Sequence, residues 1–83
     1  MNDTIKRAEK VFSKVFKEPD LILKREHQAL DFRRWDSINH MLLIARLEKE
    51  FDISISIPES SELKSVGELI DLIDQKIIQQ HGR

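Results

Sequence analysis

Apolar side chains recur at helical spacing in three separate segments, and this spacing constrains the fold more than any other feature of the sequence. The segments run over residues 4–17, 37–51 and 66–79. At about 100° per residue, each segment has a set of apolar positions that fall on one arc of a helix. The core positions expected from this pattern are Ile5, Ala8, Phe12, Val15, Phe16, Leu43, Ile44, Leu47, Phe51, Val66, Leu69, Ile70, Ile73 and Ile77. We therefore predict an all-α protein with three longer helices.

Residues at the ends of the three segments predict where each helix begins or ends. Glu18-Pro19-Asp20 is expected to end the first helix, because proline disfavours helix in the residue before it. Asp36 or Ser37 is expected to cap the second. Ser65-Val66-Gly67-Glu68 has the capping-box pattern and is expected to open the last helix, beyond which residues 81–83 should fray.

Residues 19–36 show no sustained period and predict a long loop between the first two helices. Four apolar residues are spaced like anchors that hold this loop to the core: Leu21, Leu23, Leu30 and Phe32. Trp35 closes the loop and is expected to pack against the bundle just before the second helix begins.

Ile53, Ile55 and Ile57 alternate with polar residues, which is the local pattern of a strand. No second strand-like run exists to pair with it, and an isolated strand is not stable. We therefore expect an extended connector that buries its isoleucines, stopped by Pro58 and followed by one short helical turn over residues 59–63.

Length, composition and charge exclude several classes of protein. The chain has 83 residues, enough for one domain (1–83), and contains no cysteine for a disulfide or a thiolate zinc site. Its three histidines are too scattered to suggest a metal site. No segment is apolar enough to span a membrane and no signal-peptide pattern is present, so the cytoplasm is the simplest expected location. We also expect the protein to be a monomer.

The charge is unevenly distributed along the chain. Residues 1–34 carry nine Lys/Arg and six Asp/Glu, a net of +3, whereas residues 35–83 carry five and nine, a net of −4. The basic residues of the first helix gather on one face, which is either simply solvated or a partner contact. Neither half is charged strongly enough to argue for nucleic acid by itself.

The clearest candidate for chemistry is the serine of Trp35-Asp36-Ser37-Ile38. It lies at the start of a predicted helix, where free backbone amides and the helix dipole suit an attached phosphate. Ser37 taken alone is more simply a helix cap. His40 lies three residues later, but a nucleophile and base would also need a pocket and an orienting third group, so we do not favour a hydrolase.

The second helix is apolar on two sides. Besides its core face it carries Ile38, Met41, Leu42 and Ala45 on the other side. These residues either pack against the long loop or form an exposed docking surface for partner proteins. Helix periodicity favours docking for Leu42, because it points away from Leu43 and Leu47, and leaves Met41 open.

Three segments, in register over nearly the whole chain, resemble the acyl carrier proteins and the related aminoacyl and peptidyl carriers. Asp36-Ser37-Ile38 is similar to the family's Asp-Ser-Leu motif. The run 47–52, Leu-Glu-Lys-Glu-Phe-Asp, resembles the end of the family's second helix, and 63–66, Leu-Lys-Ser-Val, resembles the opening of its last. The resemblance implies a four-helix bundle of three longer helices and one short one.

The resemblance also implies a function. A phosphopantetheinyl transferase would attach 4'-phosphopantetheine to Ser37, with Asp36 both capping the helix and contacting the transferase. The arm's thiol would hold an acyl or aminoacyl group as a thioester. The implied partners are an acyl- or aminoacyl-activating ligase and downstream acyl-transferring or modifying enzymes, and the protein itself would catalyse nothing.

The chain departs from carriers of fatty acid synthesis in ways that suggest a dedicated pathway. Those carriers are strongly acidic and display carboxylates soon after the serine, where this chain has Asn39 and Leu42. The glycine common before the Asp-Ser pair is absent, and Ile57-Pro58 lies later than the family's usual Ile-Pro. The alternative is a small helical protein-interaction or nucleic-acid-binding domain without a prosthetic group, against which the lack of an aromatic platform on the basic face argues.

Overall fold

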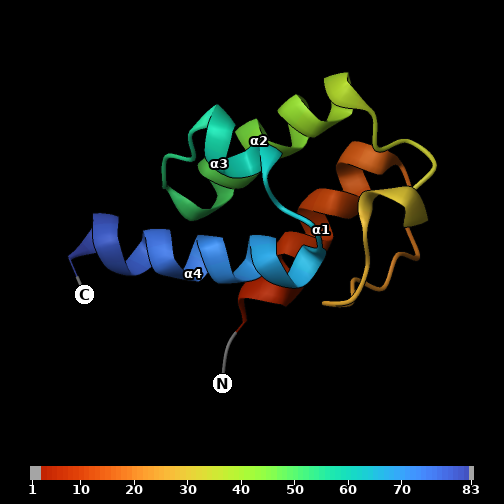
Figure 1. Cartoon of the computed structure of the whole chain (residues 1–83). Helices are drawn as coiled ribbons and strands as arrows, with labels where there is room; N and C mark the ends of the chain where they lie inside the picture. Colours follow the sequence, from red (N-terminus) through yellow and green to blue (C-terminus); the bar gives the residue numbers. More distant parts are fainter. Residues whose placement is uncertain (1–2, 83) are drawn as a thin grey trace.

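In the computed structural model, which describes residues 3–82, four α-helices enclose one hydrophobic core (Figure 1). The elements are α1 (Thr4–Phe16), the 3₁₀ turn η1 (Ala29–Asp31), α2 (Ser37–Phe51), α3 (Ile57–Ser61) and α4 (Val66–His81). The described residues contain no strand. The predicted all-α fold, with three longer helices, one short one and a long loop after the first, is confirmed.

The three longer helices end alike, in a residue with left-handed backbone conformation. Lys17 follows α1 with φ of 57°, Asp52 follows α2 with φ of 55°, and Gly82 follows α4 with φ of 73°. In each case the amide of this residue donates back to a carbonyl of the last turn. The end of α1 is therefore set at Lys17, before the chain reaches Pro19.

The core is built from the predicted helix faces. Twelve of the fourteen expected positions are buried, and Ile5 and Ile77 are partly buried against the same cluster. At one end of the core, the rings of Phe12, Phe16, Phe32 and Trp35 contact one another with centroid separations of 5.5–5.8 Å. Trp35 therefore packs against the bundle just before α2, as predicted.

The long loop is held to the core by fewer anchors than predicted. Leu23 and Phe32 are buried and Leu21 is partly buried, but Leu30 is 95% exposed, so its predicted role as an anchor is wrong. Leu30 is the central residue of η1, a turn closed by backbone hydrogen bonds from Asp31 and Phe32. The turn directs Leu30 outward and returns the chain to the core at Phe32.

The first part of the same loop is joined to the start of α4 through the backbone. The amide of Val66 donates to the His27 carbonyl and the amide of Gly67 to the Arg25 carbonyl, both at 2.8 Å. A Cβ on Gly67 would lie 3.2 Å from the Arg25 oxygen, so glycine permits this close approach. Two of the free amides at the N-terminus of α4 are thereby satisfied by the loop.

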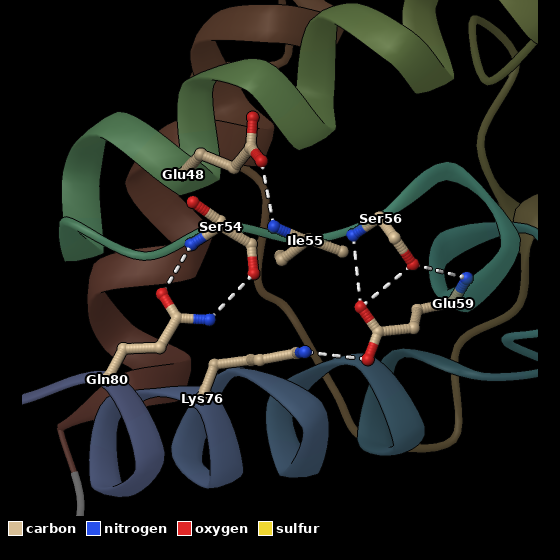
Figure 2. A network of polar contacts seen from close by, with 7 residues as sticks. All are labelled: Glu48, Ser54, Ile55, Ser56, Glu59, Lys76 and Gln80. Carbon is tan, nitrogen blue, oxygen red and sulfur yellow. Dashed lines mark hydrogen bonds and ion pairs between the residues drawn. The ribbon is translucent and has the colours of Figure 1, made fainter.

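The isoleucine-rich connector between α2 and α3 is extended and satisfies its backbone groups with side chains from two helices (Figure 2). Glu48 of α2 accepts from the Ile55 amide at 2.8 Å. Gln80 of α4 accepts from the Ser54 amide at 2.7 Å and donates to the Ser54 carbonyl at 3.0 Å. A second strand is unnecessary, because these side chains replace its hydrogen bonds. Ile53 and Ile55 are buried as predicted.

Two details near this connector differ from prediction. Ile57 is 69% exposed and begins α3, so its predicted burial is wrong and the short helix starts two residues early. The reason is that Pro58 fits the first turn of a helix, where its missing N–H is not needed, and Ser56 and Glu59 form the capping box. The predicted fraying is wrong for His81, which belongs to α4 and whose Nε2 lies 2.7 Å from the Asp52 carbonyl oxygen, and Arg83 lies outside the described residues.

Candidate functional site

Ser37 is the first residue of α2, and its side chain is exposed. Asp36 precedes it in extended conformation, and its carboxylate accepts from the Asn39 amide at 2.8 Å. The Asn39 side chain in turn donates to the Arg34 carbonyl at 2.7 Å. The predicted cap is therefore Asp36, and the amides of Ser37 and Ile38 are at the open, electropositive end of the helix.

Ser37 differs from most other serines of the chain in having an uncommitted hydroxyl. Five serine hydroxyls take part in hydrogen bonds with backbone or side-chain groups, those of Ser13, Ser56, Ser60, Ser61 and Ser65. Within residues 3–82 the hydroxyls of Ser37 and Ser54 have no such partner, and Ser54 lies in the connector rather than at a helix start. Ser37 is thus a free hydroxyl at a helix N-terminus.

His40 is oriented by Trp35 and not by Ser37. The indole Nε1 of Trp35 donates to His40 Nδ1 at 3.0 Å, and the two ring planes lie within 18° of each other. Because an indole nitrogen can only donate, Nδ1 is the acceptor and the proton of the neutral imidazole lies on Nε2. His40 Nε2 is buried and has no partner among the described residues. A serine–histidine nucleophile pair is therefore not formed.

A cavity of about 770 Å³ opens beside Ser37. Its walls come from the start and one flank of α2, from α3 and from the start of α4. Apolar side chains contribute most of the wall, between several polar residues that include Asp36, Ser37, Glu48 and Lys64, and His40 also lines the cavity. A cavity with apolar walls and a few placed polar groups suits a small ligand or an attached chain.

The four residues predicted either to pack or to dock are all exposed, although they divide between two flanks of α2. Ile38 is 79% exposed, Met41 64% and Leu42 42%, and Ala45 is exposed as well. Met41 and Ala45 line the cavity beside Ser37, whereas Leu42 faces a groove between α2 and α1. None of the four is a core residue or is partly buried against the core.

Sequence reasoning missed two contributors to this region. Ile57 and Leu63 line the cavity from α3 and the segment after it, yet Ile57 was expected to be a buried connector residue. The signal was present in Pro58, since proline in the second position of a helix places the helix start at Ile57. The pairing of Trp35 with His40 had no local signal, because it depends on how the loop meets α2.

Within residues 3–82 no group of three or more His, Asp or Glu side chains is placed to hold a metal ion. None of the helices described there combines the length and the apolar character needed to cross a bilayer.

Comparisons with known proteins find similarity over most of the chain. Residues 9–73 match the family model described as "Phosphopantetheine attachment site". The chain is 33% identical over 76 residues to an acyl carrier protein from Buchnera aphidicola subsp. Schizaphis graminum, an alignment that covers 92% of this chain and 96% of that protein.

A solved structure agrees with these matches. The solution structure of a holo acyl carrier protein from Geobacter metallireducens superposes with a TM-score of 0.89 at 35% sequence identity. The superposition covers 99% of this chain and 94% of that chain. Similarity therefore extends over the entire helical bundle.

Proposed function

Because this chain belongs to the acyl carrier protein family, we propose that Ser37 is the residue to which its phosphopantetheine is attached. The protein is a carrier with a covalently attached phosphopantetheine, and it is not an enzyme. A small binding domain without a prosthetic group, the alternative considered from sequence, is therefore wrong. One observation carries the assignment of Ser37: it is an exposed, unbonded hydroxyl at the N-terminus of α2, beside the cavity.

The surroundings of Ser37 fit such a group. The open end of α2 supplies backbone amides and a favourable dipole for a phosphodiester. The Asp36 carboxylate is occupied by the Asn39 amide, which offsets part of its repulsion toward a phosphate. The buried His40 Nε2–H is a donor without an acceptor, and the amide carbonyls of the arm are acceptors.

The protein and the phosphopantetheine arm have separate roles. When attached, the arm supplies a terminal thiol that holds an acyl group as a thioester, a group that this cysteine-free chain lacks. The residues of the chain present the attachment point, offer an apolar wall to the attached chain and supply surfaces for partner enzymes. Modification requires a phosphopantetheinyl transferase, for which we propose Asp36 as a contact.

The finer function that we propose is service to a dedicated biosynthetic pathway. Support comes from the exposed apolar side chains of α2, those of Ile38, Met41, Leu42 and Ala45, and from Asn39 and Leu42 at positions where carboxylates were expected after the serine. The partners would be an acyl- or aminoacyl-activating ligase and downstream acyl-transferring or modifying enzymes that recognise an apolar helix. We further propose that residues 1–83 act as one monomeric carrier domain in the cytoplasm.

Intact mass spectrometry tests the attachment site. The protein is incubated with coenzyme A, magnesium and a broad-specificity phosphopantetheinyl transferase, beside the variants Ser37→Ala and Ser54→Ala. We expect the wild type and Ser54→Ala to gain one phosphopantetheine unit and Ser37→Ala to gain none while keeping its helical circular dichroism. Modification of folded Ser37→Ala would refute the assignment.

A further inference from the structure

A groove of about 720 Å³ between α1 and α2 is rich in positive charge. It is distinct from the cavity beside Ser37, with which it shares no residue. The floor includes Val11 and Val15 of α1 and Leu42 of α2. Around this apolar floor stand five cationic side chains, those of Lys14, Lys17, Arg34, Arg46 and Lys49. We call the surface formed by these apolar and cationic residues, together with Asn39 and Glu50, the basic groove.

The cations of the basic groove are not neutralised within the protein. None of the five takes part in an ion pair among residues 3–82. The single carboxylate in the lining is Glu50, and it pairs instead with Arg7 at 2.9 Å. Arg7 also donates to the Glu50 carbonyl at 2.6 Å and lies over the Phe51 ring. Five like charges therefore share one concave surface whose single carboxylate is already paired with Arg7.

Such an arrangement disfavours the isolated fold slightly and attracts an anionic partner strongly. Like charges repel within about one Debye length, roughly 10 Å at 0.1 M salt. A concave surface lined by one sign of charge concentrates the field and steers an oppositely charged partner. The groove also reaches the neighbourhood of Ser37, because Arg34 and Asn39, which are hydrogen-bonded to each other, belong to its lining.

We infer that the basic groove is a docking surface for a partner protein that presents an acidic surface with an apolar side chain at its centre. The carboxylates of the partner face the five cations, and its apolar side chain contacts Leu42 and the valine floor. Complementary charge around an apolar centre is the usual anatomy of a protein interface. This inference rests on the proposed function in one respect, that the partner acts on the arm at Ser37.

The composition of the groove favours protein over nucleic acid. Binding of single strands uses aromatic side chains on which bases stack. The described aromatic rings instead contact one another in the core or, like Phe51, are buried. A membrane surface would engage protruding apolar residues, and the most exposed one on α2, Ile38, lies outside the groove.

Charge reversal with a matched control tests the inference. The double variant Lys14→Glu/Arg46→Glu reverses one cation on each wall of the groove. The control Lys6→Glu/Lys10→Glu makes the same change in net charge on exposed positions of α1 that do not line it. The neutral variant Lys14→Gln/Arg46→Gln provides an intermediate. All variants are checked for folding by circular dichroism and thermal unfolding.

The probe is a short synthetic helical peptide with leucine on one face and glutamate elsewhere, titrated by fluorescence anisotropy and by ¹H–¹⁵N NMR. We expect shifts at groove residues and a loss of affinity of about tenfold or more in the charge-reversed variant, because several weak surface pairs act together. The neutral variant should lose less, and the control should stay within about twofold of the wild type, with affinity falling as salt is raised.

Three results would overturn the inference: equal losses in the control and the charge-reversed variant, no binding of the acidic peptide, or tighter groove-dependent binding of single-stranded DNA or phosphatidylserine vesicles. Loading by the broad-specificity transferase is measured on the same samples. Failure of the wild type to load would count against the proposed function, whereas loading without peptide binding would count against the groove alone.

Discussion

Asp36, the residue before the proposed attachment serine, has two proposed roles that substitution can separate. Asp36 caps α2 through its carboxylate, which accepts from the Asn39 amide at 2.8 Å, and we propose that it also contacts the transferase. Asparagine keeps an acceptor oxygen at the same place but removes the charge, whereas alanine removes both. The pair Asp36→Asn and Asp36→Ala therefore distinguishes the cap from the charge.

The size of the cap effect follows from the geometry. Replacing an N-cap aspartate by alanine costs about 1 kcal/mol, with a range of about 0.5–2 kcal/mol. For a domain of this length that is a fall in Tm of roughly 4–8 °C. Replacement by asparagine removes only the attraction between the aspartate charge and the helix dipole, about 0.3–1 kcal/mol at an exposed site. We expect Asp36→Ala to lower Tm clearly more than Asp36→Asn.

Modification of Ser37 by the transferase should respond differently to the two Asp36 substitutions. If the carboxylate meets a cation of the transferase, both variants will show a lower kcat/KM for modification of Ser37, by a similar factor. Ser65→Ala is the matched control, because Ser65 caps α4 in the same way by accepting from Glu68. It should lose stability but load like the wild type. Equal falls in Tm for both Asp36 variants would refute the capping argument, and wild-type loading of Asp36→Asn would refute the contact.

Three further predictions follow from individual contacts. The hydrogen bond from Lys76, first among its causes, lowers the pKa of Glu59 from 4.5 to about 2. Its contribution to stability is therefore present above pH 4.5 and lost as pH falls toward 2, so the gap in Tm between wild type and Glu59→Gln should close over that window; a gap independent of pH would contradict this. Phe12→Ala removes a fully buried ring and should cost about 3–5 kcal/mol in urea unfolding; a loss below about 1 kcal/mol would contradict the packing. Leu42→Glu should weaken loading by a partner ligase with Tm nearly unchanged, whereas Leu43→Glu, at a buried position, should prevent folding; a large fall in Tm for Leu42→Glu would show that Leu42 is a core residue.

The sequence predicted the helices and their core faces closely because both are local properties. The 3.6-residue spacing of apolar side chains marks the buried face of α2 at Leu43 and Leu47 without knowledge of what covers it. Capping is equally local: Ser65 accepts from Glu68 as the motif predicts. The second half of that capping box differs, since the Glu68 carboxylate accepts from the Lys64 amide, one residue earlier than expected.

The tertiary structure decided which apolar residues outside the helices are covered. Leu30 and Ile57 were expected to be buried, yet one lies in η1 and the other begins α3, and both side chains are largely exposed. Burial of a loop residue depends on where distant segments pass, and single-residue hydropathy carries no such information. The sequence indicated that the connector between α2 and α3 has no partner strand. Its hydrogen bonds with Glu48 and Gln80 could not be predicted, because they depend on α2 and α4 lying on either side of it (Figure 2).

The features of the candidate site also divide into those predicted from the sequence and those that depend on tertiary packing. The sequence by itself predicted the serine and its capping aspartate, which are neighbours in the chain, and the resemblance to a carrier, which rests on three short segments. Only the tertiary structure brought His40 to Trp35, opened a cavity beside Ser37 and gathered five cations from α1, the loop and α2 around one groove. Periodicity fixes the side of a helix on which a residue lies, but the neighbours that it meets are set by packing between segments far apart in the chain.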